Sequence, residues 1–566
     1  MARVRWGSCD AREGISVMAS QQVRDLVDHY WEGLLERDPL MGTFIGDERY
    51  DDRLPDLGAD GRAAEETACR QALEALAGID PDTLDDSDRA DVDVMRAICE
   101  RSLARIEQRI DRFEVVNHMH GAGTMLAQVA SLQRADTPDR VDRYEARLRA
   151  FPTMLDAAIE IAREAVATGV VTPRIVAERA LAQLDRILAL APEDSPAMLP
   201  LGDDAVVKER IAATVREVLY PAHARFRDVV REEYLPASTQ TIGMSALPGG
   251  AEMYAAEVLG WTSLDLDPKT VHELGVERFE QIQTERDVVA AELGFPTPAA
   301  AIADRTARGE NTLPSPEALV AMAEDQVRRS WEIAPSFFGR LPRANCQVRR
   351  VEEFREADEP FAFYNPPTED GSRPGIYYIN AYDLSDRALH HVASVTYHEA
   401  NPGHHFQIAL EQETAGRSAL RRFGGAFAGS AYCEGWGLYS ERLADEMGLY
   451  LDGWERLGML DNQAHRAARL ITDTGIHMLG WTREASIAKL EDAGQTHTDA
   501  AIEVDRYIGM PGQALCYMVG MIEIEKAREA TREREGAAFS LREFHDRVLA
   551  IGQLPLPSFR RAFGTS

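Results

Sequence analysis

The sequence predicts a large, mainly α-helical protein with a small β-sheet placed just before its most unusual motif. Apolar residues recur at helical spacing through most of residues 21–240 and again from residue 384 to the end. Two short strand-like runs lie between these regions, the second of them rich in Tyr and Ile. A length of 566 residues with 45% hydrophobic residues is enough for a large buried core.

The helical pattern begins after a short N-terminal segment, residues 1–20, which we expect to be disordered. The stretch "QQVRDLVDHYWEGLLERDP" (21–39) then carries Val23, Val27 and Tyr30 on one apolar stripe. Similar patterns continue, with proline and glycine between them, as far as residue 240. We therefore divide the chain into a helical region over residues 21–240 and a second region over residues 241–566.

The predicted sheet and the helix after it lie in the second region. The runs "NCQVRRVEEF" (345–354) and "PGIYYINAYD" (374–383) have the composition of strands. The following stretch, 384–401, is expected to be a helix with Ser385 as its N-terminal cap. This helix leads directly into the motif that dominates the functional interpretation.

Composition excludes several classes of partner and location. The net charge of −32 is spread along the chain, which argues against binding nucleic acid or an anionic membrane surface. Six cysteines without a Cys-x-x-Cys pair are typical of reduced thiols in a reducing compartment. The N-terminus has no apolar stretch of signal-peptide length, and no later run approaches a membrane span. We expect a cytoplasmic protein.

The stretch "SVTYHEANPGHHFQ" (394–407) places a proline among three histidines and a glutamate. A His-Glu pair with a second His four residues after the first is the zinc-binding pattern of many peptidases, but position 402 is proline here. On an unbroken helix, His404 would lie roughly 240° around the axis from His398, and His405 about 10 Å further along it. Neither histidine could then share an ion with His398.

An interruption of the helix would remove this obstacle. Pro402 lacks an amide donor and Gly403 permits unusual backbone angles, so a local bulge there could bring a later histidine into the required place. To take the place of a histidine four residues after His398, His404 requires a bulge that accommodates two extra residues, whereas His405 requires one that accommodates three. His404 is therefore the predicted metal ligand and His405 the alternative.

A catalytic zinc site needs three protein ligands and an open position for water. The segment "SAYCEGWGLYSERLADEMG" (430–448) offers Glu434, a carboxylate that is costly to bury unless it is paired or bound to a metal. Glu399, next to a predicted ligand, is the natural general base for a water held at the ion. His390 and His391 are interpreted as packed or surface residues.

These motifs carry a resemblance to a known family. "HEANPGHHFQ", "YCEGWGLYSERL", "DTGIHMLGWTREAS" and "RYIGMPGQALCYMVG" resemble the bacterial family called domain of unknown function 885, which is similar to the Glu-type zincins. That resemblance implies one Zn²⁺ bound by His398, His404 and Glu434. In such zincins a carboxylate behind the ligands orients a histidine. The position four after Glu434 is Leu438, which has no carboxylate, so this role is left unplaced, with Glu441 as a candidate.

Peptide hydrolysis also needs a donor to the developing oxyanion. Tyr507 is the first candidate and His477 the second, with Asp473 four residues before His477 to hold its ring. The pair Arg506–Tyr507 resembles one found in angiotensin-converting-type peptidases. Arg506 is also a candidate for binding a substrate carboxylate.

Two tyrosines complete the predicted substrate site. Tyr517 is a further substrate-binding candidate, and Tyr378 lies in the run before the motif helix. In Glu-type zincins an edge strand at that place hydrogen-bonds the extended substrate, and we expect the same of the strand that holds Tyr378. The alternative is an ordinary strand of the sheet without this role.

We therefore expect a zincin-like metallopeptidase that hydrolyses short peptides. By resemblance to helical oligopeptidases, residues 21–240 would form one wall of a deep substrate cleft. Two alternatives stay open: a zinc-dependent hydrolase of a non-peptide amide or ester, and a non-catalytic metal-binding protein. The sequence indicates no oligomeric state.

Overall fold

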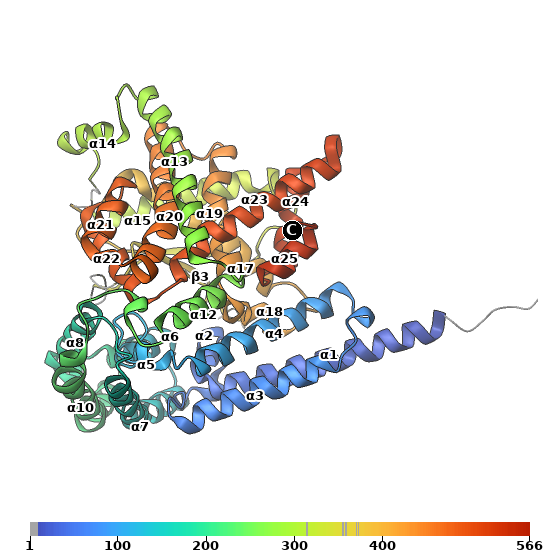
Figure 1. Ribbon diagram of the computed structural model, residues 1–566. Coiled ribbons are helices and arrows are strands. Elements are labelled where there is room, and N and C mark those ends of the chain that lie inside the picture. The colour runs from blue at the N-terminus through green and yellow to red at the C-terminus, as the bar shows by residue number, and fades with distance from the viewer. Residues whose placement is uncertain are drawn as a thin grey trace, which may run out of the picture.

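The computed structural model describes residues 9–312, 315–353, 356, 359–369, 371, 373–385 and 387–565. The protein is mainly helical (Figure 1) and contains a small sheet, as the sequence predicts. The sheet has three strands. Among the described residues, none of the helices combines the length and the apolar composition needed to cross a bilayer.

The elements follow one another in chain order. The helices of the first region are α1 (Cys9–Arg37), α2 (Pro39–Ile45), α3 (Ala59–Ala77), α4 (Asp86–Glu107), α5 (Asp111–Glu114), α6 (Met125–Leu132), α7 (Pro138–Thr168), α8 (Arg174–Ala189), α9 (Ala205–Thr214), α10 (Tyr220–Val229) and α11 (Leu235–Ala237). The elements of the second region are α12 (Gly250–Thr262), α13 (Pro268–Glu292), α14 (Pro298–Ala307), α15 (Pro316–Ile333), β1 (Cys346–Arg350), β2 (Ala362–Asn365), β3 (Gly375–Ile379), η10 (Leu389–His391), α16 (Val392–Glu399), α17 (His404–Gln412), α18 (Ala419–Phe423), α19 (Ala431–Glu446), α20 (Gly453–Leu479), α21 (Arg483–Asp492), α22 (His497–Gly509), α23 (Cys516–Glu535), α24 (Leu541–Ile551) and α25 (Leu556–Phe563).

The N-terminal helix begins earlier than the sequence predicts. Helix α1 starts at Cys9, so the expectation of disorder over residues 1–20 is wrong for residues 9–20, and residues 1–8 lie outside the described part. At Ser20 the helix already has a tertiary contact, because the Ser20 hydroxyl donates to Asp88 of α4. The helix therefore begins on the N-terminal side of the apolar stripe, which starts at Val23.

Two apolar cores are built mainly from residues of the first region. One lies between Val115 and Tyr234, and the other joins α1–α4 to Leu420 and Phe423 of α18. In Figure 1 the helices of the first 240 residues, blue to green, fill the lower part of the molecule, where α12 and α18 of the second region also lie. The division predicted at residues 240–241 falls in the segment between α11 and α12, although the core of the second region also takes in Ile110 from the first.

Helix α20 runs through the middle of the second region, and every residue from Leu457 to His477 is buried. Its ends follow from local sequence: Asp452 accepts hydrogen bonds from the first amides of the helix, and Gly480, with φ of 71°, ends it in a left-handed conformation. Helix α20 packs along α13, while α19 packs along α23. Helix α16 is enclosed by α15, α19 and α20, so whatever α16 carries is deep in the protein.

The sheet has the strand order β1-β3-β2, with β1 parallel and β2 antiparallel to β3. Strands β1 and β3 confirm the two predicted runs, but β2 was not predicted. Because β2 pairs along the second side of β3, Tyr378 lies in the central strand, between Arg349 and Phe363. The expectation that the strand of Tyr378 is an edge strand that binds substrate is therefore wrong.

The helix before the motif is shorter than predicted. The chain forms the 3₁₀ turn η10 at residue 389 and enters α16 at Val392. Ser385 does not cap it, because the Ser385 hydroxyl donates to Asp383 in the preceding turn. The predicted start at residue 384 is corrected by about two helical turns.

Candidate metal centre

Two separate helices carry the two histidines of the motif. Helix α16 ends at Glu399 and α17 begins at His404, with non-helical backbone angles at Ala400 and Gly403. The interruption is thus a break between two helices rather than a bulge within one. It brings the rings of His398 and His404 to a centroid distance of 4.7 Å with their planes nearly perpendicular, at 86°.

The break is held by side chains of the neighbouring helices. The indole of Trp436 donates to the carbonyl of Pro402 at 2.9 Å, and the hydroxyl of Ser330 donates to the carbonyl of Asn401 at 2.9 Å. Gly403 lies against the end of α16, where an added Cβ would come within 1.9 Å of the His398 carbonyl oxygen. Only glycine fits there, which explains the glycine of the Pro-Gly pair.

Glu434 in the first turn of α19 faces both histidines. Its Oε2 lies 3.6 Å from Nε2 of His398 and 3.4 Å from Nε2 of His404. Both separations exceed a normal hydrogen bond, and this buried oxygen has no hydrogen-bond partner. Two ligands bound at about 2.0–2.1 Å to a tetrahedral zinc ion would lie about 3.4 Å apart, so the spacing of these three atoms fits such an ion.

The electrostatics of Glu434 and His398 reflect this crowding. Burial raises the pKa of Glu434, but the imidazoles beside it lower that pKa well below its ordinary range. Burial lowers the pKa of His398, yet the carboxylates around it raise that pKa to about 9. Both shifts show that Glu434 and His398 together favour positive charge at this buried point.

Glu441 supplies the carboxylate behind His398. Nδ1 of His398 donates to Oε1 of Glu441 at 2.8 Å, and the Ser394 hydroxyl donates to Oε2 at 2.7 Å. A hydrogen bond at Nδ1 leaves Nε2 free to bind a metal. Leu438, at the position four after Glu434, is buried in the apolar core instead. The orienting carboxylate thus lies seven residues after Glu434, not four.

The two adjacent histidines of the motif point to different surroundings. His404 has Cys433 Sγ at 3.4 Å from its Nδ1 and Glu434 on its Nε2 side. His405 donates from Nε2 to the carbonyl of Ala344 at 3.0 Å, and its Nδ1 accepts from the hydroxyl of Tyr364 at 2.8 Å. Both nitrogens of His405 are therefore used away from Glu434, and the geometry favours His404 as the ligand.

Glu399 lies beside the histidines at the wall of a cavity. One ligand atom each of His398, Glu399 and His404 lie within 4.8 Å of one another. The cavity has an accessible volume of about 80 Å³ and opens to solvent. It is lined by Pro360, Phe361, Ala362, Arg387, Ala388, His391, Val395, His398, Glu399, Asn462, His465, Arg466, Arg469, Gln495, Asp499, Ile502, Glu503, Arg506 and Tyr517.

Two predicted oxyanion donors do not line this cavity. His477 donates from Nε2 to the carbonyl of Tyr507 at 3.0 Å and accepts at Nδ1 from the amide of Met244 at 3.3 Å, so backbone groups occupy its ring. Asp473 does not hold it, because that carboxylate accepts from Tyr254 and Gly512. The hydroxyl of Tyr507 accepts from Nε of Arg469 at 2.9 Å.

Tyr517 and Arg506, in contrast, both line the cavity. The Tyr517 ring stacks beside His398 at a centroid distance of 6.0 Å. Nη2 of Arg506 donates to the hydroxyl oxygen of Tyr517 at 3.1 Å, which leaves the phenolic hydrogen free to donate elsewhere. Tyr378 is not among the lining residues, because β2 and the segment before it stand between β3 and the cavity.

The first region contributes no described residue to the lining of this cavity. The described residues that line the cavity all come from the second region, between residues 360 and 517. Helix α22 separates the two, because its outer side binds the first region: Asn117 donates to the carbonyl of Gly509, and Arg179 pairs with Asp505. The wall predicted for residues 21–240 is not a wall of this cavity.

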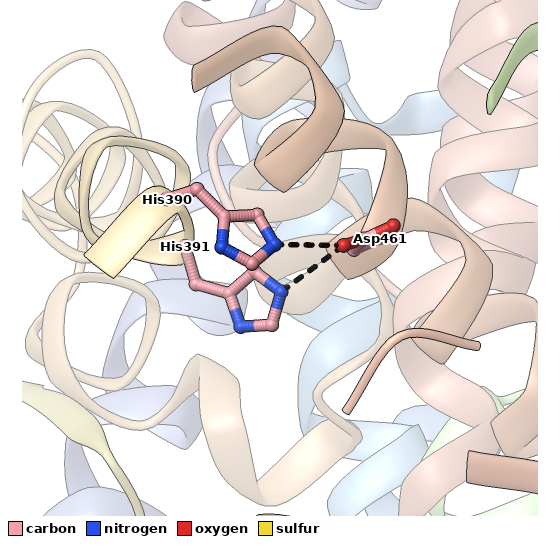
Figure 2. Close-up of side chains that lie close together, drawn as sticks. All are labelled: His390, His391 and Asp461. Atoms are coloured by element: carbon pink, nitrogen blue, oxygen red, sulfur yellow. Dashed lines mark hydrogen bonds and ion pairs between the residues drawn. The ribbon is translucent and has the colours of Figure 1, made fainter. Parts of the chain in front are cut away.

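A second group of metal-binding residue types lies two turns before His398. His390 and His391 contact the same oxygen of Asp461, at 2.9 and 3.4 Å (Figure 2). The other oxygen of Asp461 accepts from Nε of Arg286 at 2.7 Å, so a guanidinium already balances the carboxylate charge. His390 also bonds Asn311 through Nδ1 at 2.8 Å. This cluster is a buried ion-pair network that fixes η10 on α20, as the interpretation of both histidines as packed residues expects.

Sequence reasoning found Arg506 of α22 but missed the other polar residues of α20 and α22 that line the cavity. His465, Arg466 and Arg469 lie in the stretch "NQAHRAARLITDTG" (462–475), and all three are buried. A charged side chain is costly to bury unless it has a partner or a ligand. The argument that singled out Glu434 applies equally to these residues.

Comparisons with known proteins agree with this fold. A family model described as "Bacterial protein of unknown function (DUF885)" matches residues 39–562. A "putative lipoprotein" from Colwellia psychrerythraea has a similar solved structure, with 26% identity, a TM-score of 0.89 and coverage of 96% of this chain and 98% of that one. A "putative lipoprotein of unknown function" from Shewanella oneidensis shares the fold at 18% identity, a TM-score of 0.68 and coverage of 95% and 98%. A search of curated proteins found no similar sequence.

Proposed function

This chain belongs to the bacterial family of unknown function DUF885, and we propose that it is a zinc-dependent peptidase acting on short peptides. The observation that carries the proposal is the unpartnered, buried Oε2 of Glu434 between Nε2 of His398 and Nε2 of His404. A buried carboxylate oxygen without a donor is costly, and a cation bound by all three residues removes that cost.

The arrangement supports a similarity to the Glu-type zincins. The first histidine belongs to a His-Glu sequence, the second begins the next helix, a glutamate comes from a later helix, and a second carboxylate orients the first histidine. A zinc ion held by His398, His404 and Glu434 would polarise the scissile carbonyl and acidify a water molecule. The cavity beside these residues would be part of the substrate cleft.

The chain's own residues then divide the remaining chemistry. Glu399 lies at the cavity wall, where it would accept a proton from the attacking water and pass it to the leaving nitrogen. Tyr517 would donate its phenolic hydrogen to the developing oxyanion. Arg506 supports this role because its donation to the Tyr517 oxygen orients the hydroxyl.

Metal analysis together with one substitution tests the proposal. The purified protein is expected to hold one zinc ion per chain and to cleave members of a short-peptide library, read by mass spectrometry. Glu399→Gln should keep the zinc and lower turnover by about 10²–10⁴-fold. Glu332→Gln, a change of the same kind at an exposed side chain of α15, should alter neither.

Two other results would replace the proposal. Zinc bound without cleavage of any library peptide, but with hydrolysis of non-peptide amides or esters, would assign a different hydrolase. Full zinc content with no hydrolysis of either class would indicate a metal-binding protein without this activity.

A further inference from the structure

The cavity has a charge opposite to that of the whole protein. The chain carries 62 basic and 94 acidic residues, yet four arginines line the cavity: Arg387, Arg466, Arg469 and Arg506. The lining carboxylates are three, Glu399, Asp499 and Glu503. An arginine-rich lining in an acidic protein indicates a site for an anionic group.

Three of these arginines already have strong partners. Arg387 pairs with Asp499 at 2.7 Å, and Arg469 pairs with Glu503 at 2.7 Å. Arg506 donates to Gln513 at 2.8 Å and to Tyr517 at 3.1 Å. Asp499 and Glu503 are therefore already paired with arginines, and the remaining lining carboxylate is the proposed base Glu399.

Arg466 is the exception. Its closest carboxylate oxygen belongs to Glu441 at 4.0 Å, and that oxygen already accepts from His398. Its other contacts are long, 3.4 Å to Asn462 Oδ1 and 3.3 Å to His465 Nδ1. Its Nε is buried without a hydrogen-bond partner, and the residue is only 8% exposed. The planar guanidinium of Arg466 can donate two parallel hydrogen bonds to one carboxylate, and no carboxylate of the described residues accepts them.

We propose that Arg466 binds the C-terminal carboxylate of the peptide substrate, so that the protein removes residues from the carboxyl end. This inference rests on the proposed peptidase function. Arg466 is linked to the His398 ring through a single carboxylate, Glu441. Because one residue of extended chain spans at most about 3.6 Å, a carboxylate bound at Arg466 would lie within a few residues of the scissile bond.

Binding without turnover tests the inference most directly. In the zinc-loaded Glu399→Gln protein, calorimetry would compare a tetra-alanine peptide that has a free carboxylate with the same peptide amidated at its C-terminus. The free acid is expected to bind at least about tenfold more tightly, since a charge-assisted pair contributes roughly 1.5–3 kcal/mol. Adding Arg466→Gln should abolish this preference. Arg456→Gln, at a half-exposed arginine on the same helix, should preserve it.

Turnover by the unmodified enzyme separates the two proposals. Preferential cleavage of the free acid near its carboxyl end supports the inference. Equal cleavage of acid and amide would overturn the role of Arg466 while leaving the peptidase in place. Preference for an amidated peptide with a glutamate near its end would show that Arg466 binds a side-chain carboxylate instead. If neither these peptides nor any member of the peptide library is cleaved, the proposed function fails, and the calorimetric comparison still decides whether Arg466 binds the carboxylate.

Zinc content and Arg466→Lys guard against a structural explanation. Lysine keeps the positive charge but cannot donate two parallel hydrogen bonds to one carboxylate, so the preference for the free acid should be reduced rather than abolished. If Arg466→Gln weakens acid and amide binding equally, Arg466 only supports Glu441, and the inference is wrong.

Discussion

Glu441 accepts a hydrogen bond from Nδ1 of His398 across 2.8 Å, while Glu434 on the same helix faces Nε2 of that ring. The two glutamates are seven residues apart, about 10 Å along α19. Gly437, between them, makes room for the ring: an added Cβ there would lie 2.7 Å from Nε2 of His398. One helix therefore provides a predicted ligand, the space for a second ligand and the carboxylate that orients it.

Replacing the orienting carboxylate should weaken metal binding without removing a ligand. Glu441→Gln keeps an acceptor for Nδ1 of His398 but removes the negative charge. Loss of such a partner typically lowers metal affinity by about 10–100-fold. Competition against a zinc chelator measures the change, and Glu446→Gln, near the end of α19 and paired with Arg528, is the control. Equal affinity in both variants would contradict the role given to Glu441.

The identity of the second histidine ligand can be tested by a matched pair of substitutions. His404→Ala is expected to lose most of the bound zinc, since it removes Nε2 facing Glu434. His405→Ala removes the contacts with Ala344 and Tyr364, so it should lower the melting temperature yet retain zinc. Metal content after dialysis distinguishes them. Zinc loss only in His405→Ala would reverse the assignment.

Gly403 should tolerate no side chain. In Gly403→Ala the new Cβ would overlap the carbonyl of His398, so α16 and α17 must move apart. Overpacking of this kind typically costs about 1–3 kcal/mol. We expect a lower melting temperature and weaker zinc binding together. Gly202→Ala, where the Cβ meets nothing within 4 Å, is the control, and a Gly403 variant that behaves like it would disprove the strain.

The sequence predicted the parts of the fold and site that depend on local pattern. Helical periodicity identified the mainly α class, and strand composition identified β1 and β3. Arithmetic on the spacing of the histidines showed that an unbroken helix would fail, and the structure has a break at that place. These inferences need only the neighbours of a residue along the chain.

Features that depend on tertiary packing could not be predicted in this way. Strand β2 is four residues long and has little pattern of its own, so the central place of Tyr378 was missed. His477 and Asp473 have the spacing of a pair, but the approach of Met244 and Tyr254 gives each a different partner. The position of Glu441 depends on how α16 crosses α19, which no local pattern records.

The oxyanion donor offers a test between two tyrosines. Tyr517→Phe should lower turnover by about 10²–10³-fold with little change in zinc content, because it removes a donor that lines the cavity. Tyr507→Phe should chiefly lower stability, because the hydroxyl of Tyr507 is buried against Arg469 and His465. Kinetics with a cleavable peptide and thermal unfolding of both variants give the comparison. Greater loss of turnover in Tyr507→Phe would restore Tyr507 as the donor.

Asp473 should make stability depend on pH. Burial raises the pKa of this carboxyl from 3.8 to about 7, although Tyr254 and the amide of Gly512 partly oppose the rise. A folded-state pKa above the unfolded value favours folding at low pH, and this stabilisation is lost as the pH rises through about 7. At about 1.4 kcal/mol per pKa unit, the loss is on the order of a few kcal/mol.

Asp473→Asn should remove this dependence, because the amide resembles the protonated acid and keeps an oxygen for Tyr254. The melting temperature of the unmodified protein is therefore expected to fall relative to that of the variant between pH 5 and pH 8. Asp203→Asn, at a fully exposed side chain, provides the control and should follow the unmodified protein. If the curves of Asp473→Asn and the unmodified protein stay parallel across that range, Asp473 is ionised in the folded protein and the argument from burial is wrong.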